Sequence, residues 1–107
     1  MDNLYTYITD LKSRIPKIPE NSILSQTILS NEELKAVLFG FAPGQELSEH
    51  TASQPALLYF VDGTAQLTLG KDEMSAQAGT WVHMEPNLPH SIHADTQVVM
   101  LLILLKS

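Results

Sequence analysis

The chain has 107 residues, enough for one domain with a single hydrophobic core but marginal for two, so residues 1–107 are expected to form one domain. Its formal net charge of −6, with six scattered cations, argues against nucleic acid or an anionic membrane as a partner, because both attract Lys and Arg. The lack of cysteine excludes disulfides, thiol catalysis and cysteine-ligated zinc.

The N-terminal segment is expected to form a short helix followed by an extended arm. Apolar side chains recur at helical spacing over residues 2–15, with Asp2 as a candidate N-cap. Pro16 and Pro19 end the pattern, because proline cannot continue a helix. A frayed tail is an equally good interpretation. The acidic and polar start lacks the basic and apolar run of a signal peptide, so a cytoplasmic location is expected.

After the helix and arm, assigned to residues 1–21, the pattern becomes that of short β-strands separated by turns. Asp62-Gly63 predicts a hairpin between two of them. Many short strands at regular spacing predict an all-β sandwich or barrel over residues 22–107. The expected strands are Ser22–Leu29, Leu34–Phe41, Ala56–Val61, Thr64–Leu69, Met74–Ala78, Thr80–Met84, Ser91–His93 and Val98–Leu105.

The last expected strand, Val98–Leu105, is apolar at every position. Both of its faces should therefore be covered, although only one can meet the core of a small barrel. Either the N-terminal helix and arm or a second copy of the chain covers the other face. The sequence thus raises the expectation of a homodimer without excluding the monomeric alternative.

Glycine and histidine recur at regular positions in the middle of the chain. Five residues lie between Gly44 and His50, and Gly63 ends that segment; Gly79 opens a second segment that reaches His90. These spacings resemble the two motifs of the cupin superfamily, and the match covers about half of the chain. The resemblance implies a small single-domain cupin with an RmlC-like jelly-roll β-barrel.

The resemblance breaks down at the positions that bind metal. In metal-binding cupins, two histidines and a glutamate of the first motif and the histidine of the second hold one divalent metal. His50 and His90 fall on two of these positions, but Ala52 and Ala56 occupy the other two. The glycine position of the second motif holds Asn87, a residue that tolerates positive φ.

Two imidazoles are too few for a first-row metal, which usually takes three or four protein ligands. The candidates for a further ligand are His83, Glu49, Gln54 and His93. Strand alternation places His93 away from His90. His83 shares a strand face with Trp81, and the sequence leaves open whether that face is inside the barrel or outside. If it is inside, His50, His83 and His90 are the candidate ligands of one divalent metal: Zn, Ni, Fe or Mn.

Three functions remain open from the sequence. The first is a cupin that binds a small molecule, either as a binding module or as an enzyme with His50 and His90 as acid and base. The residues expected to line its pocket are Ala52, Ala56, Trp81 and Met84. The second is a metal-dependent dioxygenase or isomerase that uses His50, His90 and a substitute ligand. The third is a structural or interaction protein whose barrel is packed solid between the two histidines.

Overall fold

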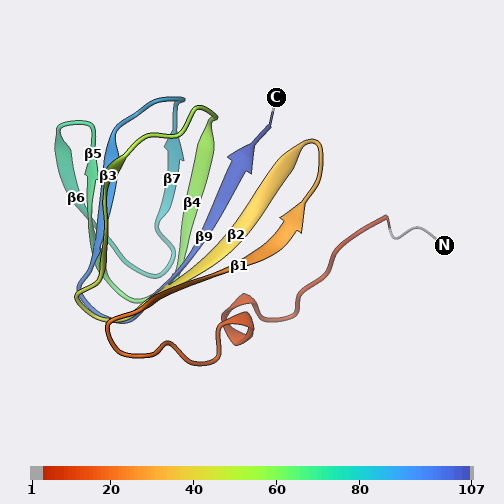
Figure 1. Cartoon of the computed structure of the whole chain (residues 1–107), viewed down its shortest axis with the longest axis horizontal. Coiled ribbons are helices and arrows are strands. Elements are labelled where there is room, and N and C mark those ends of the chain that lie inside the picture. The colour runs from red at the N-terminus through yellow and green to blue at the C-terminus, as the bar shows by residue number, and fades with distance from the viewer. Residues whose placement is uncertain (1–3, 107) are drawn as a thin grey trace.

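The computed structural model describes residues 4–106, which form two antiparallel β-sheets that face each other as the walls of a barrel (Figure 1). One sheet has the strand order β1-β2-β9-β4-β7 and the other β3-β8-β5-β6. The predicted all-β fold is therefore confirmed. The elements are η1 (Leu11–Arg14), β1 (Ile23–Ser30), β2 (Leu34–Phe41), β3 (Glu46–His50), β4 (Ala56–Asp62), β5 (Ala65–Leu69), β6 (Asp72–Ala76), β7 (Trp81–Met84), β8 (His90–Ala94) and β9 (Val98–Leu105).

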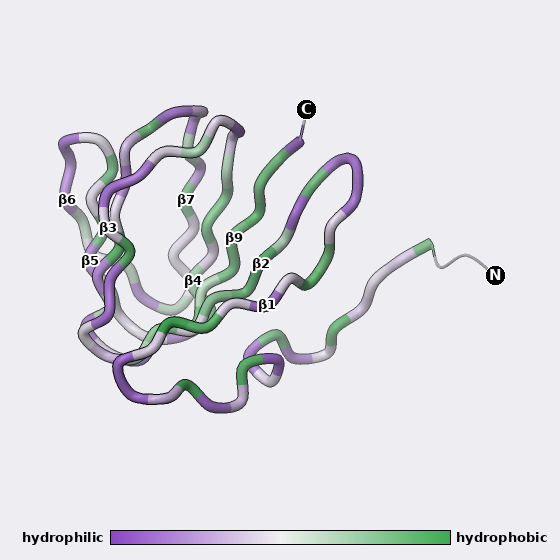
Figure 2. Tube along the Cα trace, in the orientation of Figure 1, coloured by the Kyte–Doolittle hydropathy of each residue, from purple (hydrophilic) through white to green (hydrophobic). Residues whose placement is uncertain are grey.

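The core lies between the two sheets, and the alternation of residues along each strand fills it. On β4, for example, Leu58 and Phe60 point inward and are buried, whereas Tyr59 between them is exposed. Burying one such side chain contributes about 1.5–3 kcal/mol. Apolar residues are concentrated on β2, β4 and β9, the middle strands of the larger sheet (Figure 2). The largest fully buried side chains are Phe41, Phe60, Leu38, Leu58, Leu67, Met100, Val98 and Val99.

The central strand β9 is covered on both faces along its first half. Val98 and Met100 belong to the main core, whereas Val99 lies on the outer face and packs in a second cluster with Ile15 and Ile18 of the N-terminal segment. Gly40 makes room for this contact, because a Cβ atom there would lie 2.7 Å from Ile18 Cδ1. The prediction that the N-terminal segment covers this face is thus correct for part of it.

The N-terminal helix is much shorter than predicted. Over the described part of residues 2–15 the only helical element is the 3-10 turn η1, and Asp10 rather than a residue at the start caps it, by accepting a hydrogen bond from Lys12 N at 3.2 Å. Asp2, the expected cap, lies outside the described residues. A longer helix would need a surface for its apolar face, because short isolated helices are marginal in water.

Most expected strands are present within one or two residues, but two features differ. Asp62-Gly63 is a turn, yet not a hairpin, since β4 pairs with β7 and β9 whereas β5 pairs with β6 and β8. The turn therefore carries the chain from one sheet to the other. The sequence also gave no strand signal for β3, which is an edge strand with a single apolar residue, Leu47. No helix in residues 4–106 is long and apolar enough to cross a bilayer.

Candidate functional site

His50 at the end of β3 and His90 at the start of β8 lie directly opposite each other in the antiparallel pair. Their ring centroids are 4.2 Å apart, and the ring planes are tilted by 56°. The two histidines of the sequence motif, 40 positions apart, therefore form one side-chain pair. The pair lies at the end of the barrel that is uppermost in Figure 1.

A register shift in β3 places His50 beside His90. Leu47 pairs with Ile92 and His50 with His90, so a step of three residues along β3 corresponds to a step of two along β8. With regular alternation Glu49, two residues after the half-buried Leu47, would occupy the inward position opposite His90. A bulge of this kind re-aims the following side chain, and here it exchanges a carboxylate for an imidazole.

Each imidazole is held by the backbone carbonyl two residues before it. The Nδ1 atom of His50 lies 2.8 Å from Ser48 O, and that of His90 lies 2.9 Å from Leu88 O. A carbonyl oxygen can only accept, so Nδ1 carries the hydrogen in both rings. In a neutral imidazole Nε2 then has a free lone pair. Two neutral rings in this state cannot hydrogen-bond to each other, because both Nε2 atoms are acceptors.

The loop between β7 and β8 is fixed to its neighbours by backbone hydrogen bonds. Asn87 N donates to Ala52 O at 2.7 Å, and Gly70 N donates to Pro89 O at 2.8 Å. Asn87, at the glycine position of the second motif, has a φ of 67°. It therefore adopts the left-handed conformation, which asparagine tolerates better than most residues. These bonds fix the segment that carries the Leu88 carbonyl, and thereby the orientation of His90.

The two histidines differ in their exposure to solvent. His50 is exposed, whereas His90 retains only 6% of its accessible surface. Burial lowers the pKa of His90 below the usual value of histidine; the hydrogen bond to Leu88 opposes this effect, and the neighbouring His50 adds to it. His90 is therefore a neutral base at pH 7, with its Nε2 lone pair available.

Acidification should destabilise the protein through His90. Below pH 6.5 an unfolded His90 binds a proton that the folded state resists, so the free energy of unfolding falls with pH by up to about 1.4 kcal/mol per unit until the lowered pKa is reached. In His90→Asn the amide can still donate to Leu88 O but does not titrate. Urea unfolding at pH 7.5 and pH 5.5 should show a larger loss for the wild type; equal losses would contradict the lowered pKa.

His83 does not join the histidine pair. It lies on β7 and pairs with Leu57 of β4. It alternates with the buried Val82 and Met84 and is exposed on the outer face of the larger sheet. Trp81 shares this face and is 62% exposed, so it does not line the barrel interior. The sequence left open which face of this strand points into the barrel, and the structure places the face of His83 outside. Within residues 4–106, no three His, Asp or Glu side chains lie close enough together to hold a metal ion.

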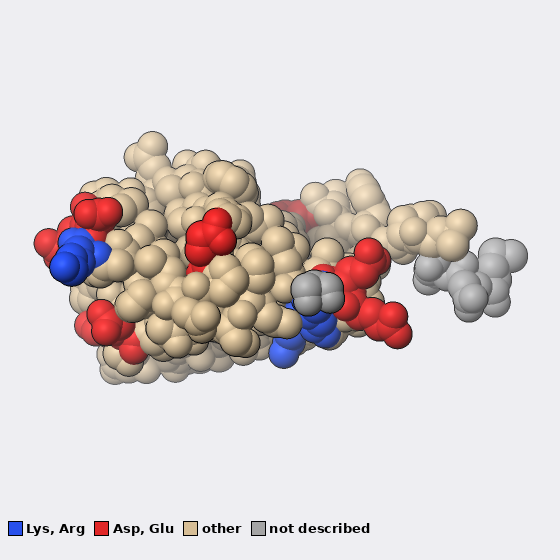
Figure 3. All heavy atoms as spheres, turned by 90° about the horizontal axis from the view of Figure 1, so that it is seen from above, with Lys and Arg blue, Asp and Glu red and all other residues tan. Residues whose placement is uncertain are grey.

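The other predicted site residues are spread over the same end of the barrel. Ala56 and Met84 are buried and pair with each other across β4 and β7, whereas Ala52 is half-buried in the loop after β3. Leu69, which pairs with His90, is only half-buried. Viewed from this end, the charged side chains gather mainly at the two sides of the molecule, and the surface between them is largely uncharged (Figure 3).

The remaining candidates for a third ligand lie away from the pair. His93 is on the outer face of β8, as alternation predicted, and its Nδ1 is 3.4 Å from Glu46 Oε1. Glu49 is exposed on strand β3, and Gln54 is half-buried in the loop after it. None of these side chains supplies the missing carboxylate or imidazole beside His50 and His90.

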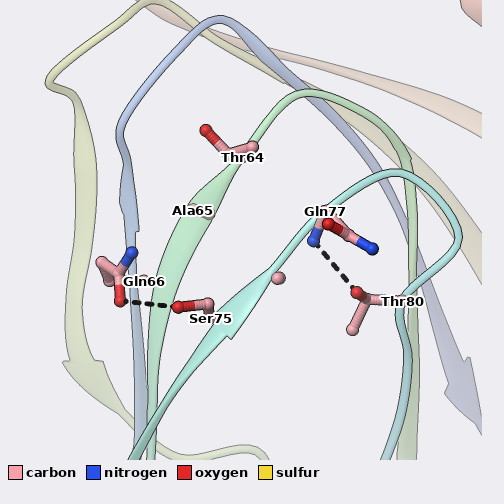
Figure 4. Close-up of a pocket in the computed structure, with 7 residues that line it drawn as sticks. Thr64, Ala65, Gln66, Ser75, Gln77 and Thr80 are labelled. Atoms are coloured by element: carbon pink, nitrogen blue, oxygen red, sulfur yellow. Dashed lines mark hydrogen bonds between the residues drawn. The ribbon is translucent and has the colours of Figure 1, made fainter.

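Two cavities are described among residues 4–106, and neither is lined by His50 or His90. The larger, about 400 Å³, lies at the opposite end of β5 and β6, and its side chains are alanines and neutral polar groups (Figure 4). Gln66 and Ser75 are joined there by a hydrogen bond of 3.3 Å. The smaller, about 250 Å³, is beside Glu20 and Pro43. The histidine pair lies outside these two cavities, with His50 exposed and His90 buried beside it.

Comparisons with known proteins agree with this fold. The family model described as Cupin domain matches residues 37–105. A conserved protein of unknown function from Streptococcus pyogenes is 24% identical, with a TM-score of 0.85 over 96% of this chain and 90% of that one. A cupin superfamily protein from Desulfitobacterium hafniense is 22% identical, with a TM-score of 0.85 over 99% and 97%.

An RmlC-like cupin from Shewanella frigidimarina is 21% identical, with a TM-score of 0.76 over 79% of this chain and 77% of that one. At these identities the similarity of the solved structures concerns the fold alone. None of the curated proteins compared with the chain matches its sequence.

Proposed function

The chain belongs to the cupin domain family, and on this basis we propose that it binds a small molecule beside His50 and His90 at one end of the barrel. The observation that carries the proposal is the carbonyl bond at each Nδ1, which leaves two neighbouring Nε2 acceptors that have no hydrogen-bond partner among residues 4–106. A ligand with O–H or N–H donors satisfies both. Small diols, enols and hydroxy acids have this chemistry.

The pair is also suited to proton transfer. His90 is buried and neutral, so its Nε2 can take a proton from a bound hydroxyl or enol, while His50 beside it is exposed to solvent. A neutral base needs a pKa near or below the working pH, and burial keeps His90 in that state. Binding alone and acid–base catalysis both use the same two nitrogen atoms.

A metal-dependent activity has less support. The described residues offer a metal two imidazoles, with alanine at both remaining motif positions and His83 on the outer face. Two Nε2 donors with their Nδ1–H groups anchored do have the orientation of metal-ligating histidines. Two protein ligands, however, do not make a closed or catalytic site for a first-row metal. The residues therefore do not fit a resident metal, and no step is assigned to one.

The proposal is tested by NMR of ¹⁵N-labelled imidazoles during titration with a panel of small diols, enols and hydroxy acids. We expect both rings to be Nδ1–H tautomers and at least one compound to shift their Nε2 resonances. In His50→Asn its affinity should fall roughly tenfold, the value of one hydrogen bond of about 1–1.5 kcal/mol. The control His83→Asn, on the outer face, should bind like the wild type.

A panel that leaves both rings unperturbed, or binding that is equal in His50→Asn, would contradict the proposal. Metal analysis of protein purified without added metal tests the alternative, a metal-dependent activity. Stoichiometric metal that is retained by His83→Asn and lost from His50→Asn would assign the pair to a metal instead.

A further inference from the structure

The larger cavity lies well away from the histidine pair. It is formed where β5 begins, where β6 ends and where the chain turns toward β7 (Figure 4). Ala65 at this end of β5 pairs with Ala94, whereas Leu69 at the other end pairs with His90, so about 13 Å of strand separates the two places. The volume of about 400 Å³ is near the lower end of the range for small-molecule sites. The cavity is therefore large enough for a small ligand of its own.

The residues that line this cavity are mostly polar and uncharged. The polar ones are Thr64, Gln66, Ser75, Gln77 and Thr80. Ala65 and Ala76 are the apolar ones, and both are buried, so an apolar ligand would cover little surface here. Among the described residues that line the cavity there is no Lys, Arg or His, so an anion would find no counter-charge. The composition fits a neutral ligand that both donates and accepts hydrogen bonds.

The side chain of Gln66 has a fixed orientation in the wall of the cavity. Its Nε2 donates to Asp95 Oδ2 at 2.8 Å, and its Oε1 accepts from Ser75 Oγ at 3.3 Å. A carboxylate can only accept, which settles which end of the amide faces Asp95. Ser75 uses its hydrogen in this contact, so its oxygen presents lone pairs to a ligand. Asp95 also places a negative charge behind the wall, which disfavours anionic ligands further.

Another wall is the turn from Gln77 to Thr80, which hydrogen bonds hold in place. Thr80 N donates to Gln77 O at 2.9 Å, and Gln77 N donates to Thr80 Oγ1 at 3.0 Å. Gly79 N donates to Phe60 O at 2.8 Å and so joins the turn to β4. The Thr80 hydroxyl accepts in this arrangement, so its hydrogen is available to donate to a ligand. The Gln77 amide takes no part in these bonds and offers both donors and an acceptor.

We propose that this cavity binds a neutral, hydroxyl-rich compound of monosaccharide size, such as a sugar or a polyol. One hydroxyl group of such a compound can donate to the Ser75 oxygen and another can accept from Thr80, while further hydroxyls bond to Thr64 and Gln77. Because the walls are held by hydrogen bonds of their own, little order has to be created when the ligand binds. The site is separate from the histidine pair and does not depend on it.

NMR titration of the ¹⁵N-labelled full chain with glucose, galactose, mannose and sorbitol tests the site. We expect at least one compound to shift the backbone amides of Gln77 and Gly79 saturably. Its dissociation constant should be on the order of 1 mM, as a few neutral hydrogen bonds at a solvent-exposed site allow. Ser75→Ala and Gln77→Ala should each weaken this binding roughly fivefold, the contribution of one hydrogen bond. Ser25→Ala and Gln26→Ala remove the same groups from exposed positions on β1 and are the matched controls, which should bind like the wild type.

The position of the shifts distinguishes this site from the histidine pair. Binding at the cavity should persist in His50→Asn, and the 6-phosphate of the compound that binds best should bind more weakly, because Asp95 repels it. Shifts confined to the imidazoles of His50 and His90, equal binding in the wild type, Ser75→Ala and Gln77→Ala, or tighter binding of the phosphate would overturn the proposal. So would the absence of any shift at about 50 mM of each compound, far above the expected dissociation constant.

Discussion

Replacing Gly63 by alanine should destabilise the protein by about 3 kcal/mol or more, because two costs coincide at this residue. Gly63 has a φ of 89°, a conformation that costs an L-residue about 1–2 kcal/mol. An added Cβ would also overlap the carbonyl oxygen of Gln97 and lie 2.9 Å from Val98 Cα. These are backbone atoms at the start of β9, so they cannot move aside without disturbing the central strand.

Gly44→Ala is the matched control. Gly44 has a similar φ of 84°, but a Cβ there would have no other heavy atom within 4 Å. It should lose only the conformational part, about 1–2 kcal/mol. Urea unfolding of both variants measures the difference. Equal losses would mean that the segment at Gln97 yields to the added methyl group and that the close approach is not a constraint.

Phe60→Ala should be among the most damaging core substitutions, with a loss of about 3–5 kcal/mol. Phe60 is fully buried on β4, between the two sheets, and its removal leaves a cavity that the surrounding strands cannot close. For a domain of this size the loss lowers the melting temperature by roughly 12 °C or more. Differential scanning calorimetry measures the effect directly.

Phe39→Ala provides the comparison, because Phe39 also packs against the main core but is only half-buried on β2. The same atoms are removed in both variants, so the difference in the free energy of unfolding reports the difference in burial. We expect Phe39→Ala to lose less than Phe60→Ala, because a smaller area of the Phe39 side chain is removed from water. An equal loss would show that this side of the barrel is packed as tightly as its centre.

The sequence predicted the fold well where local pattern and tertiary role agree. Leu34–Phe41 and Val98–Leu105 coincide with β2 and β9, because both strands are rich in apolar residues and lie in the middle of the larger sheet. The sequence-based prediction failed where contacts between residues far apart in the chain determine which strands pair. Asp62-Gly63 has the composition of a hairpin turn, but the strands after it pair across sheets, and nothing within a few residues of the turn specifies that choice.

The arrangement of the candidate residues could be predicted only in part. His50 and His90 were recognised from their spacing, and the structure brings them together. The face of His83 was undecidable, since Trp81 and His83 alternate with Val82 and Met84, and either set could be buried. The bulge in β3 and the carbonyl partners of the two rings had no sequence signal, because backbone atoms at Ser48 and Leu88 supply them.

The position of β9 also determines when, during synthesis of the chain, the barrel can fold. It lies between β2 and β4 and pairs with both along nearly its whole length, yet it follows all other strands in the chain. A nascent polypeptide that ends before residue 98 has a larger sheet split in two, with β1-β2 and β4-β7 lacking the strand that joins them. The long-range pairing of this topology is slow to form. Folding of the barrel must therefore follow translation of β9, and until then its apolar strands depend on protection from aggregation.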